Sequence, residues 1–567
     1  MSARIPCLVI ALAFLATLST SCVSPKPHPQ DARETVEQLK RDVVARNDAA
    51  AMCDLGVCYE LGRGVQKDLQ EAATWYRKAA DLDNLMAMYN LGTCYRDGRG
   101  VEKDPKEALK WFRKAAALGD ANAMLSVGLC YRYGQGVERD QKESAAWFRK
   151  AADLGLPDAM FDLAQCYAAG LGVEKDLTEA VRWFRRAADL GNTNAMGYLA
   201  DCLRKGLGVE KDLTEAAKWY RKAADLGDAQ AMRSVGLCYI DGQGVEKDEK
   251  EAVKWFRKAA DLGDAYAMLS VGMCYRNGQG VEKDEKEAVK WFRKAADLGD
   301  ANAMGALADC LREGQGVEED LTEAAKWFRK AADLGHPTAM CDLGWCLEQG
   351  LGVDKDEKQA VEWYRKAIAR GHPRAMNNLG ILYRDGRGVE KDLNEAARLI
   401  RQAADLGYPL AMTNLGSFYE NGTGIEKDLR EAVAWYRQAA EKGHPEGMCS
   451  LAWCLEQGRG VEKDDKQAVE WYRSAAARGH ARAMNNLGVL YRDGRGVEKD
   501  LQEAARWFKK AADLGYPLAM TSLGVLYRDG RGVEKDEKEA LRWYQKAADL
   551  GETHAKDALD LLNKKQP

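Results

Sequence analysis

The stretch YRDGRGVEKDLQEAARWFKKAADLG, from Tyr491 to Gly515, decides the fold, because a near copy, YRDGRGVEKDEKEALRWYQKAADLG, follows from Tyr527 to Gly551. An Ala-Met or Gly-Met pair recurs along the chain, with its methionine at fourteen positions 36 residues apart, from Met52 to Met520. Repeats of this length are typical of solenoids, in which each unit is stable only against its neighbours. The sequence therefore predicts an all-α solenoid of about fourteen 36-residue helix-turn-helix repeats.

Apolar and small residues in each unit predict two helices that pack together. In the first unit one helix face carries Ala51, Met52, Leu55, Gly56 and Tyr59, at helical spacing. Gly56 has no side chain, so we expect the second helix to approach closely there. The predicted inward stripe of that second helix consists of Ala72, Trp75, Tyr76, Ala79 and Ala80.

The residues of the glycine-rich loop have structural roles at the end of the first helix and at the start of the second. Gly62 and Gly64 can take the positive φ that ends the first helix and reverses the chain. Asp68, three residues before Glu71, has the spacing of a capping box at the start of the second helix. The loop fits neither a phosphate-binding nor an EF-hand pattern, and a catalytic constellation would not be repeated fourteen times.

The pattern AMxxLGxCYxxGxGVEKDxxEAxxWFRKAADLG resembles the Sel1-like repeat, a relative of the tetratricopeptide repeat. The resemblance implies a right-handed α/α superhelix with adaptor or scaffold roles, whose first helices line the concave side. Some Sel1-like proteins are described as cell-wall or β-lactam hydrolases. That activity would need a reactive group outside the repeat pattern, and the sequence contains no CxxC, HExxH or GxSxG motif. We therefore predict no enzyme activity, no metal and no cofactor.

The N-terminus predicts export. Residues 1–21 read as a signal peptide, with Arg4 before the apolar run IPCLVIALAFLATL. LSTSC, ending at Cys22, resembles the lipobox of bacterial lipoproteins, which implies lipidation of Cys22; the alternative is ordinary cleavage that leaves a free thiol. We expect a periplasmic or outer-membrane-anchored lipoprotein, or else a secreted protein.

The rest of the chain is predicted to fall into four parts. Proline-rich residues 22–30 form a tether, and residues 31–47 a helix that caps the first unit. Fourteen repeats occupy 48–551, and 552–567 form a C-terminal capping helix.

Charge and the variable positions of the first helix guide the prediction of partners. With 84 Lys plus Arg against 88 Asp plus Glu, the chain offers no basic field for nucleic acid. Cys53, Val57, Glu60 and Leu61 should point away from the core, and these positions vary between units. Down this face the candidate binding residues are Arg96, Arg132, Arg204, Arg276, Arg312, Trp345, Arg384, Trp453, Arg492 and Arg528, with Glu348, Glu420 and Glu456 as exceptions to the arginines.

We expect this face to bind an extended, partly acidic peptide or protein segment, with the protein acting as a monomeric scaffold of the cell envelope. The alternatives are a solvated face whose arginines pair with the following Asp or Glu, a binder of peptidoglycan or another glycan, and a passive spacer. Trp345 and Trp453 stand outside the regular second-helix position, and their burial against a neighbouring unit is as compatible with the sequence as their exposure.

The cysteines and histidines have structural explanations. Ten cysteines share the repeat position of Cys58, too far apart in a stack to pair, and should be small buried hydrophobes. His336, His372, His444 and His480 share one turn between units and are interpreted as turn residues.

Overall fold

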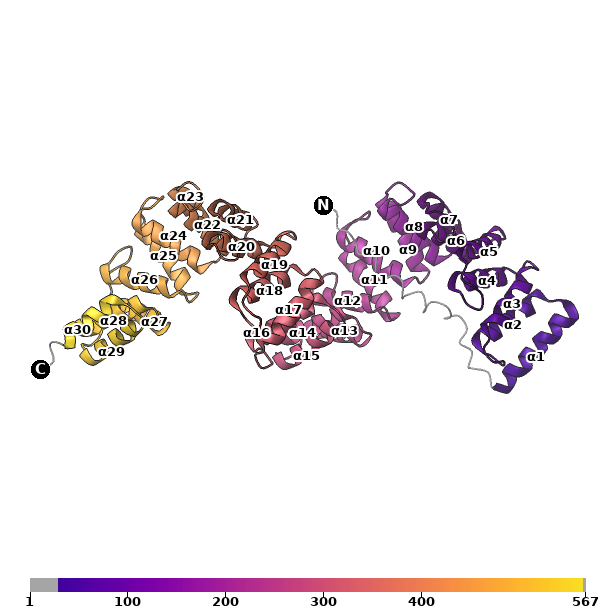
Figure 1. Ribbon diagram of the computed structural model, residues 1–567, viewed down its shortest axis with the longest axis horizontal. Coiled ribbons are helices and arrows are strands. Elements are labelled where there is room, and N and C mark those ends of the chain that lie inside the picture. The colour runs from indigo at the N-terminus through magenta and orange to yellow at the C-terminus, as the bar shows by residue number, and fades with distance from the viewer. Residues whose placement is uncertain (1–28, 564–567) are drawn as a thin grey trace. The chain divides into compact units, whose positions relative to one another are not determined.

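The computed structural model describes residues 29–563, which form thirty α-helices and no β-strand (Figure 1). Twenty-eight of these helices make fourteen consecutive pairs, which confirms the predicted fold class. The signal peptide, Cys22, the tether up to residue 28 and residues 564–567 lie outside the described residues.

The first helices of the pairs are α2 Ala49–Leu61, α4 Leu85–Asp97, α6 Ala121–Tyr133, α8 Pro157–Ala169, α10 Thr193–Lys205, α12 Ala229–Asp241, α14 Ala265–Asn277, α16 Ala301–Glu313, α18 Pro337–Gln349, α20 Pro373–Asp385, α22 Pro409–Asn421, α24 Pro445–Gln457, α26 Ala481–Asp493 and α28 Pro517–Asp529. The second helices are α3 Leu69–Ala80, α5 Pro105–Ala117, α7 Gln141–Asp153, α9 Leu177–Asp189, α11 Leu213–Asp225, α13 Glu249–Asp261, α15 Glu285–Asp297, α17 Leu321–Asp333, α19 Glu357–Ile368, α21 Leu393–Asp405, α23 Leu429–Glu441, α25 Asp465–Ala476, α27 Leu501–Asp513 and α29 Glu537–Asp549.

The repeats group into two compact units. The first comprises the described residues up to 267 together with 279–281, and the second comprises 268–278 and the residues from 282 on. In the first unit the second helices from α3 to α11 each pack on their own first helix and on the first helix of the next repeat, and in the second unit those from α17 to α27 do the same.

A helix flanks the repeats at each end. α1, Pro29–Arg46, buries Val36 and packs on α2. It begins inside the predicted tether, so the tether prediction is wrong for residues 29 and 30, because proline is tolerated in the first turn of a helix. α30, Thr553–Asn563, buries Ala555 against the last repeat. None of the helices described is both long and apolar enough to cross a membrane.

The close approach predicted at Gly56 is confirmed. A Cβ atom added there would lie 2.6 Å from Cε1 of the fully buried Tyr76, so the ring occupies the space that a side chain would need. The same glycine-to-ring contact recurs from Gly92 with Phe112 to Gly524 with Tyr544. The core of each repeat is thus a small residue on the first helix against a large residue on the second.

The second-helix tryptophans are less deeply buried than predicted. Seven of the thirteen are buried: Trp111, Trp183, Trp219, Trp255, Trp327, Trp363 and Trp543. The other six, at the same repeat position, are half-buried: Trp75, Trp147, Trp291, Trp435, Trp471 and Trp507. A lysine three residues later covers several of these rings; Lys78 Nζ lies 4.0 Å from the Trp75 ring centroid.

The capping box is only half confirmed. The Asp68 carboxylate accepts from the N–H groups of Gln70 and Glu71, at 2.9 and 3.0 Å. The Asp68 N–H, however, donates to the Tyr59 carbonyl at 3.0 Å, and the equivalent bond recurs in every repeat. The preceding helix therefore takes the place that a reciprocal Glu71 carboxylate would have in a full capping box.

The two loop glycines have different tasks. Gly62, at φ 69°, ends α2 in the left-handed conformation, as predicted. A Cβ on Gly100, the second loop glycine of the next repeat, would lie 1.8 Å from the Leu69 carbonyl oxygen. Successive repeats therefore touch backbone to backbone at this second glycine.

Candidate functional site

The predicted ladder of cations on the first helices is largely neutralised. Four of its arginines donate through Nε, at 2.7 Å, to the aspartate that follows each in the sequence: Arg96, Arg384, Arg492 and Arg528. In each pair a second bond runs from Nη2 to the other carboxylate oxygen. Each guanidinium lowers the pKa of its partner, as Arg384 does for Asp385. This is the ion-paired arrangement that the sequence left open as an alternative.

The remaining arginines of the ladder contact acids or aromatic rings. Arg132 donates to Asp162 at 2.6 Å, and Arg204 to Asp201 at 3.1 Å. Arg312 lies 2.7 Å from Asp309, and the Arg276 guanidinium lies 5.6 Å from the Phe292 ring centroid. The face therefore displays paired charges rather than free cations.

Three cysteines of the predicted outward face point inward. Cys53, Cys341 and Cys449 are buried, although helix geometry places them away from the core of their own repeat. The next first helix covers two of them: Arg374 Nε donates to Cys341 Sγ at 3.3 Å, and Arg482 Nε to Cys449 Sγ at 3.4 Å. A helical wheel of one repeat does not include that neighbour.

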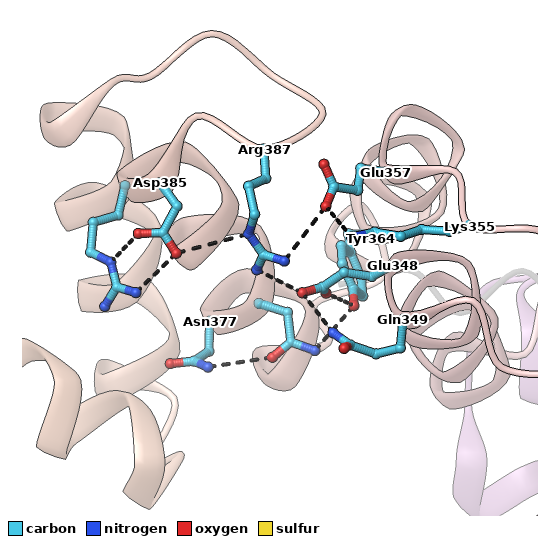
Figure 2. A network of polar contacts seen from close by, with 10 residues as sticks. Glu348, Gln349, Lys355, Glu357, Tyr364, Asn377, Asp385 and Arg387 are labelled. Atoms are coloured by element: carbon cyan, nitrogen blue, oxygen red, sulfur yellow. Dashed lines mark hydrogen bonds and ion pairs between the residues drawn. The ribbon is translucent and has the colours of Figure 1, made fainter. Parts of the chain in front are cut away.

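Each glutamate that replaces arginine on this face belongs to a polar cluster that the sequence prediction missed, and Figure 2 shows the one at Glu348. Glu348, only 7% exposed, accepts from the Tyr364 hydroxyl at 2.8 Å and from Arg387 Nη2 at 2.8 Å. Burial and the Glu348 carboxylate raise the pKa of Tyr364. Arg387 belongs to the loop of the following repeat, so the cluster joins two repeats.

The sequence contains a signal for this cluster. Every glutamate at this position has a tyrosine 16 residues later and an arginine 39 residues later. The glutamate contacts both of them. The sets are Glu60 with Tyr76 and Arg99, Glu348 with Tyr364 and Arg387, Glu420 with Tyr436 and Arg459, and Glu456 with Tyr472 and Arg495. We call them the Glu-Tyr-Arg clusters.

A chain of asparagine side chains extends one of these clusters. Asn414 Nδ2 donates to Asn377 Oδ1 at 2.8 Å, Asn377 donates to Asn378 at 3.4 Å, and Asn378 donates to the Tyr364 hydroxyl at 3.4 Å. Figure 2 shows Asn377 beside the Glu348 cluster. The amides lie on consecutive first helices, α20 and α22, which contact each other directly.

Trp345 and Trp453 are half-buried at the same face. Both rings rest on the hydrophobic core, and each also faces a cation: the Arg312 guanidinium is 5.8 Å from the Trp345 centroid, and that of Arg459 is 4.7 Å from Trp453. Each tryptophan therefore offers part of its surface to solvent from a fixed position. Together with the half-buried Asn378, Asn414 and Asn486, they form what we call the amide face of the second unit.

The histidines cap helices. Nδ1 of His336 accepts from the Ala339 N–H at 3.2 Å, and His372, His444 and His480 each begin a first helix in the same way. The turn position was predicted and the cap was not. Burial lowers the pKa of three of these imidazoles, those of His336, His372 and His444.

Eight of the ten cysteines that were predicted to be buried are buried, whereas Cys58 and Cys202 are half-buried. Eleven of the thirteen cysteines in residues 29–563 are buried, and none of the thirteen is in a disulfide. Burial raises the pKa of Cys94 and of Cys130 to about 11, which suppresses the reactive thiolate. Within the same described residues, no three His, Cys, Asp or Glu side chains gather so that they could hold a metal ion.

Known proteins similar to this chain share its repeat. A family model described as the Sel1 repeat matches fourteen times in succession, over residues 49–84, 85–120, 121–156, 157–192, 193–228, 229–264, 265–300, 301–336, 337–372, 373–408, 409–444, 445–480, 481–516 and 517–552. No curated protein matches the chain.

Several solved structures resemble this chain, including the following two. One is a protective antigen of uropathogenic Escherichia coli displaying an SLR fold, with 33% identity and a TM-score of 0.58 over 81% of this chain and 97% of that one. The other is a Sel1 repeat protein from Oxalobacter formigenes, with 31% identity and a TM-score of 0.46 over 59% of this chain and 99% of that one. Because the family model covers nearly all of the described residues, the chain belongs to the Sel1 repeat family.

Proposed function

We propose that this protein is a non-catalytic scaffold that binds an extended peptide segment of a partner protein on the amide face of the second unit. The observation that carries the proposal is the set of half-buried side-chain amides of Asn378, Asn414 and Asn486, with Trp345 in the repeat before Asn378 and Trp453 in the repeat between Asn414 and Asn486. An extended backbone presents N–H and C=O groups at regular spacing, and amides both donate and accept. Fixed aromatic rings beside them supply apolar contact area at low entropic cost.

Acidic character in the ligand is a secondary part of the proposal. Because Arg384 and Arg492 already pair with the following aspartates, a ligand carboxylate would have to compete for them. A variant with Arg384, Arg492 and Arg528 changed to Glu should therefore weaken the binding of acidic peptides and leave that of neutral ones nearly unchanged.

The direct test is a selection with residues 23–567 from a random dodecapeptide library displayed on phage. Peptides that bind the wild-type chain should lose about tenfold or more in affinity when Trp345 and Trp453 are both changed to Ala, with the helical circular dichroism retained. Tyr198→Ala is the matched control, because Tyr198 is an exposed aromatic residue on a first helix of the other unit. A selection without binders, or binding that Tyr198→Ala reduces as much, counts against the proposal.

The expected location gives a second line of test. We propose that the scaffold works in the cell envelope, anchored through a lipid on Cys22. Labelled palmitate should be incorporated into the wild-type chain and not into Cys22→Ala. Sedimentation of the purified protein with cell-wall sacculi, in the absence of selected peptides, would instead favour a glycan ligand.

A further inference from the structure

Two stretches of the second unit repeat almost the same sequence 108 residues apart. QAVEWYRKAIARGHPRAMNNLGILYRDGRGVEKD begins at Gln359, and QAVEWYRSAAARGHARAMNNLGVLYRDGRGVEKD begins at Gln467. Both copies build the same polar contacts: Glu456 accepts from Tyr472 at 2.9 Å, as Glu348 does from Tyr364. The copies can therefore be compared atom by atom, and any difference is informative.

They differ at one acceptor. In the first copy the amide chain ends on Asn414, whose Nδ2 donates to Asn377 Oδ1 at 2.8 Å. In the second copy Asn485 Nδ2 donates to Asn486 at 3.3 Å, but Asn485 Oδ1 is buried and has no hydrogen-bond partner. The residue in the place of Asn414 is Ser522, which is too short to supply the amide.

A buried acceptor without a hydrogen-bond donor lowers the stability of the folded protein. Asn485 is only 7% exposed, and a buried polar atom without a partner loses the hydrogen bond that it would make in water. Its own Nδ2 and the neighbouring amide of Asn486, which donates to Tyr472 at 3.2 Å, fix the side chain so that it cannot turn away. The carbonyl oxygen is thus fixed without a donor, and other atoms of the protein cover it.

We infer that Asn485 Oδ1 accepts an amide N–H from a bound peptide once the side chains that cover it move aside, as Asn377 Oδ1 accepts from Asn414 in the first copy. Asn414 thereby supplies from within the chain the donor that the peptide would supply, whereas Ser522 leaves the acceptor of the second copy unpaired. This site rests on the proposed peptide-binding function and lies at one end of the amide face, between α26 and α28. Val489 and Val525, half-buried on the same face, lie beside it for an apolar side chain of the peptide.

The chain itself suggests the variants. Ser522→Asn should fill the acceptor as Asn414 does, raise the thermal midpoint and weaken peptides selected on the wild-type chain by about tenfold or more. Asn485→Thr removes the acceptor with a residue that the equivalent positions already hold at Thr413 and Thr521, and it should weaken the same peptides. Asn414→Ser should remove the internal donor of the first copy, so that Asn377 Oδ1 becomes a second acceptor for the same peptide, and the affinity measured by calorimetry should rise.

Each result has one meaning. If neither Ser522→Asn nor Asn485→Thr changes the affinity of the selected peptides, the proposed site at Asn485 is refuted. Peptide binding elsewhere on the chain would remain supported. A library without any binder would overturn the proposed function and this site together. Binding of N-acetylglucosamine oligomers that Ser522→Asn abolishes, without any peptide binder, would assign the acceptor to an acetamido sugar and refute the peptide.

Discussion

The Glu-Tyr-Arg cluster at Glu348 should hold repeats nine and ten together, and replacing Arg387 by leucine should loosen that junction. Arg387 Nη2 lies 2.8 Å from the Glu348 carboxylate, whose side chain is 9% exposed, whereas the arginine side chain is 34% exposed. Removing one partner of a fully buried ion pair costs about 3–5 kcal/mol. Because one member here is a third exposed, and the Tyr364 hydroxyl remains bound to Glu348, we expect a loss of about 2–3 kcal/mol.

The matched control is Arg384→Leu, three residues earlier. Its ion pair with Asp385 is exposed on both sides, at 40% and 34%, so the expected loss is about 0–1 kcal/mol. A second control is the double variant with Glu348→Gln, in which no unpaired charge is buried. We expect the double variant to recover most of the stability that Arg387→Leu loses.

The assay should be local, because long repeat arrays need not unfold in a single step. Native-state amide exchange, followed by mass spectrometry, reports the free energy of opening of α18 and α20. A loss of about 2 kcal/mol accelerates exchange there by roughly 30-fold. Equal acceleration in Arg387→Leu and Arg384→Leu, or no change in either, would refute the view that burial makes this ion pair different.

The remaining predictions concern packing and thiol chemistry. Gly488→Val should lower the free energy of unfolding by about 1–3 kcal/mol, measured by heat or urea, because a Cβ at Gly488 would lie 2.8 Å from Phe508 Cε1. Gly488→Ala should lower it less, since Ala452 occupies the equivalent position one repeat earlier. Maleimide should modify the native chain slowly at pH 8, because burial shields most cysteines and raises the pKa of thiols such as Cys94 to about 11, and it should modify them all after denaturation. Fast modification of several thiols in the folded chain would contradict the buried assignment.

The repeat itself could be predicted because it is a local property. The 36-residue period, the Asp68 cap, the turn at Gly62 and the close approach at Gly56 depend on residues within one repeat, and the structure confirms each of them. A helix needs only its own spacing and caps to be recognised. The fold therefore followed from the sequence in nearly every detail.

The face between repeats could not be predicted in the same way. Glu348 and Cys341 lie on the outward side of a helix considered alone, yet the next repeat covers them with Arg387 and Arg374. Burial at such positions depends on how two repeats stack, which a helical wheel does not contain. The contact between Glu348 and Arg387 does have a signal in the sequence, because glutamate, tyrosine and arginine recur together at fixed spacing across the repeats.

The comparison of the two copies also shows how a repeat array can combine stability with binding. A hydrogen-bond chain that begins on the chain's own amide, as at Asn414, has every buried acceptor paired and contributes to stability. The same chain with Ser522 in that place leaves Asn485 Oδ1 unpaired, so part of the stabilisation becomes available only when a donor arrives from outside. One side chain therefore decides whether a repeat junction is complete alone or requires a partner. It follows that stability and affinity should change in opposite directions in Ser522→Asn, and a variant that raised both would show that the open acceptor has no part in binding.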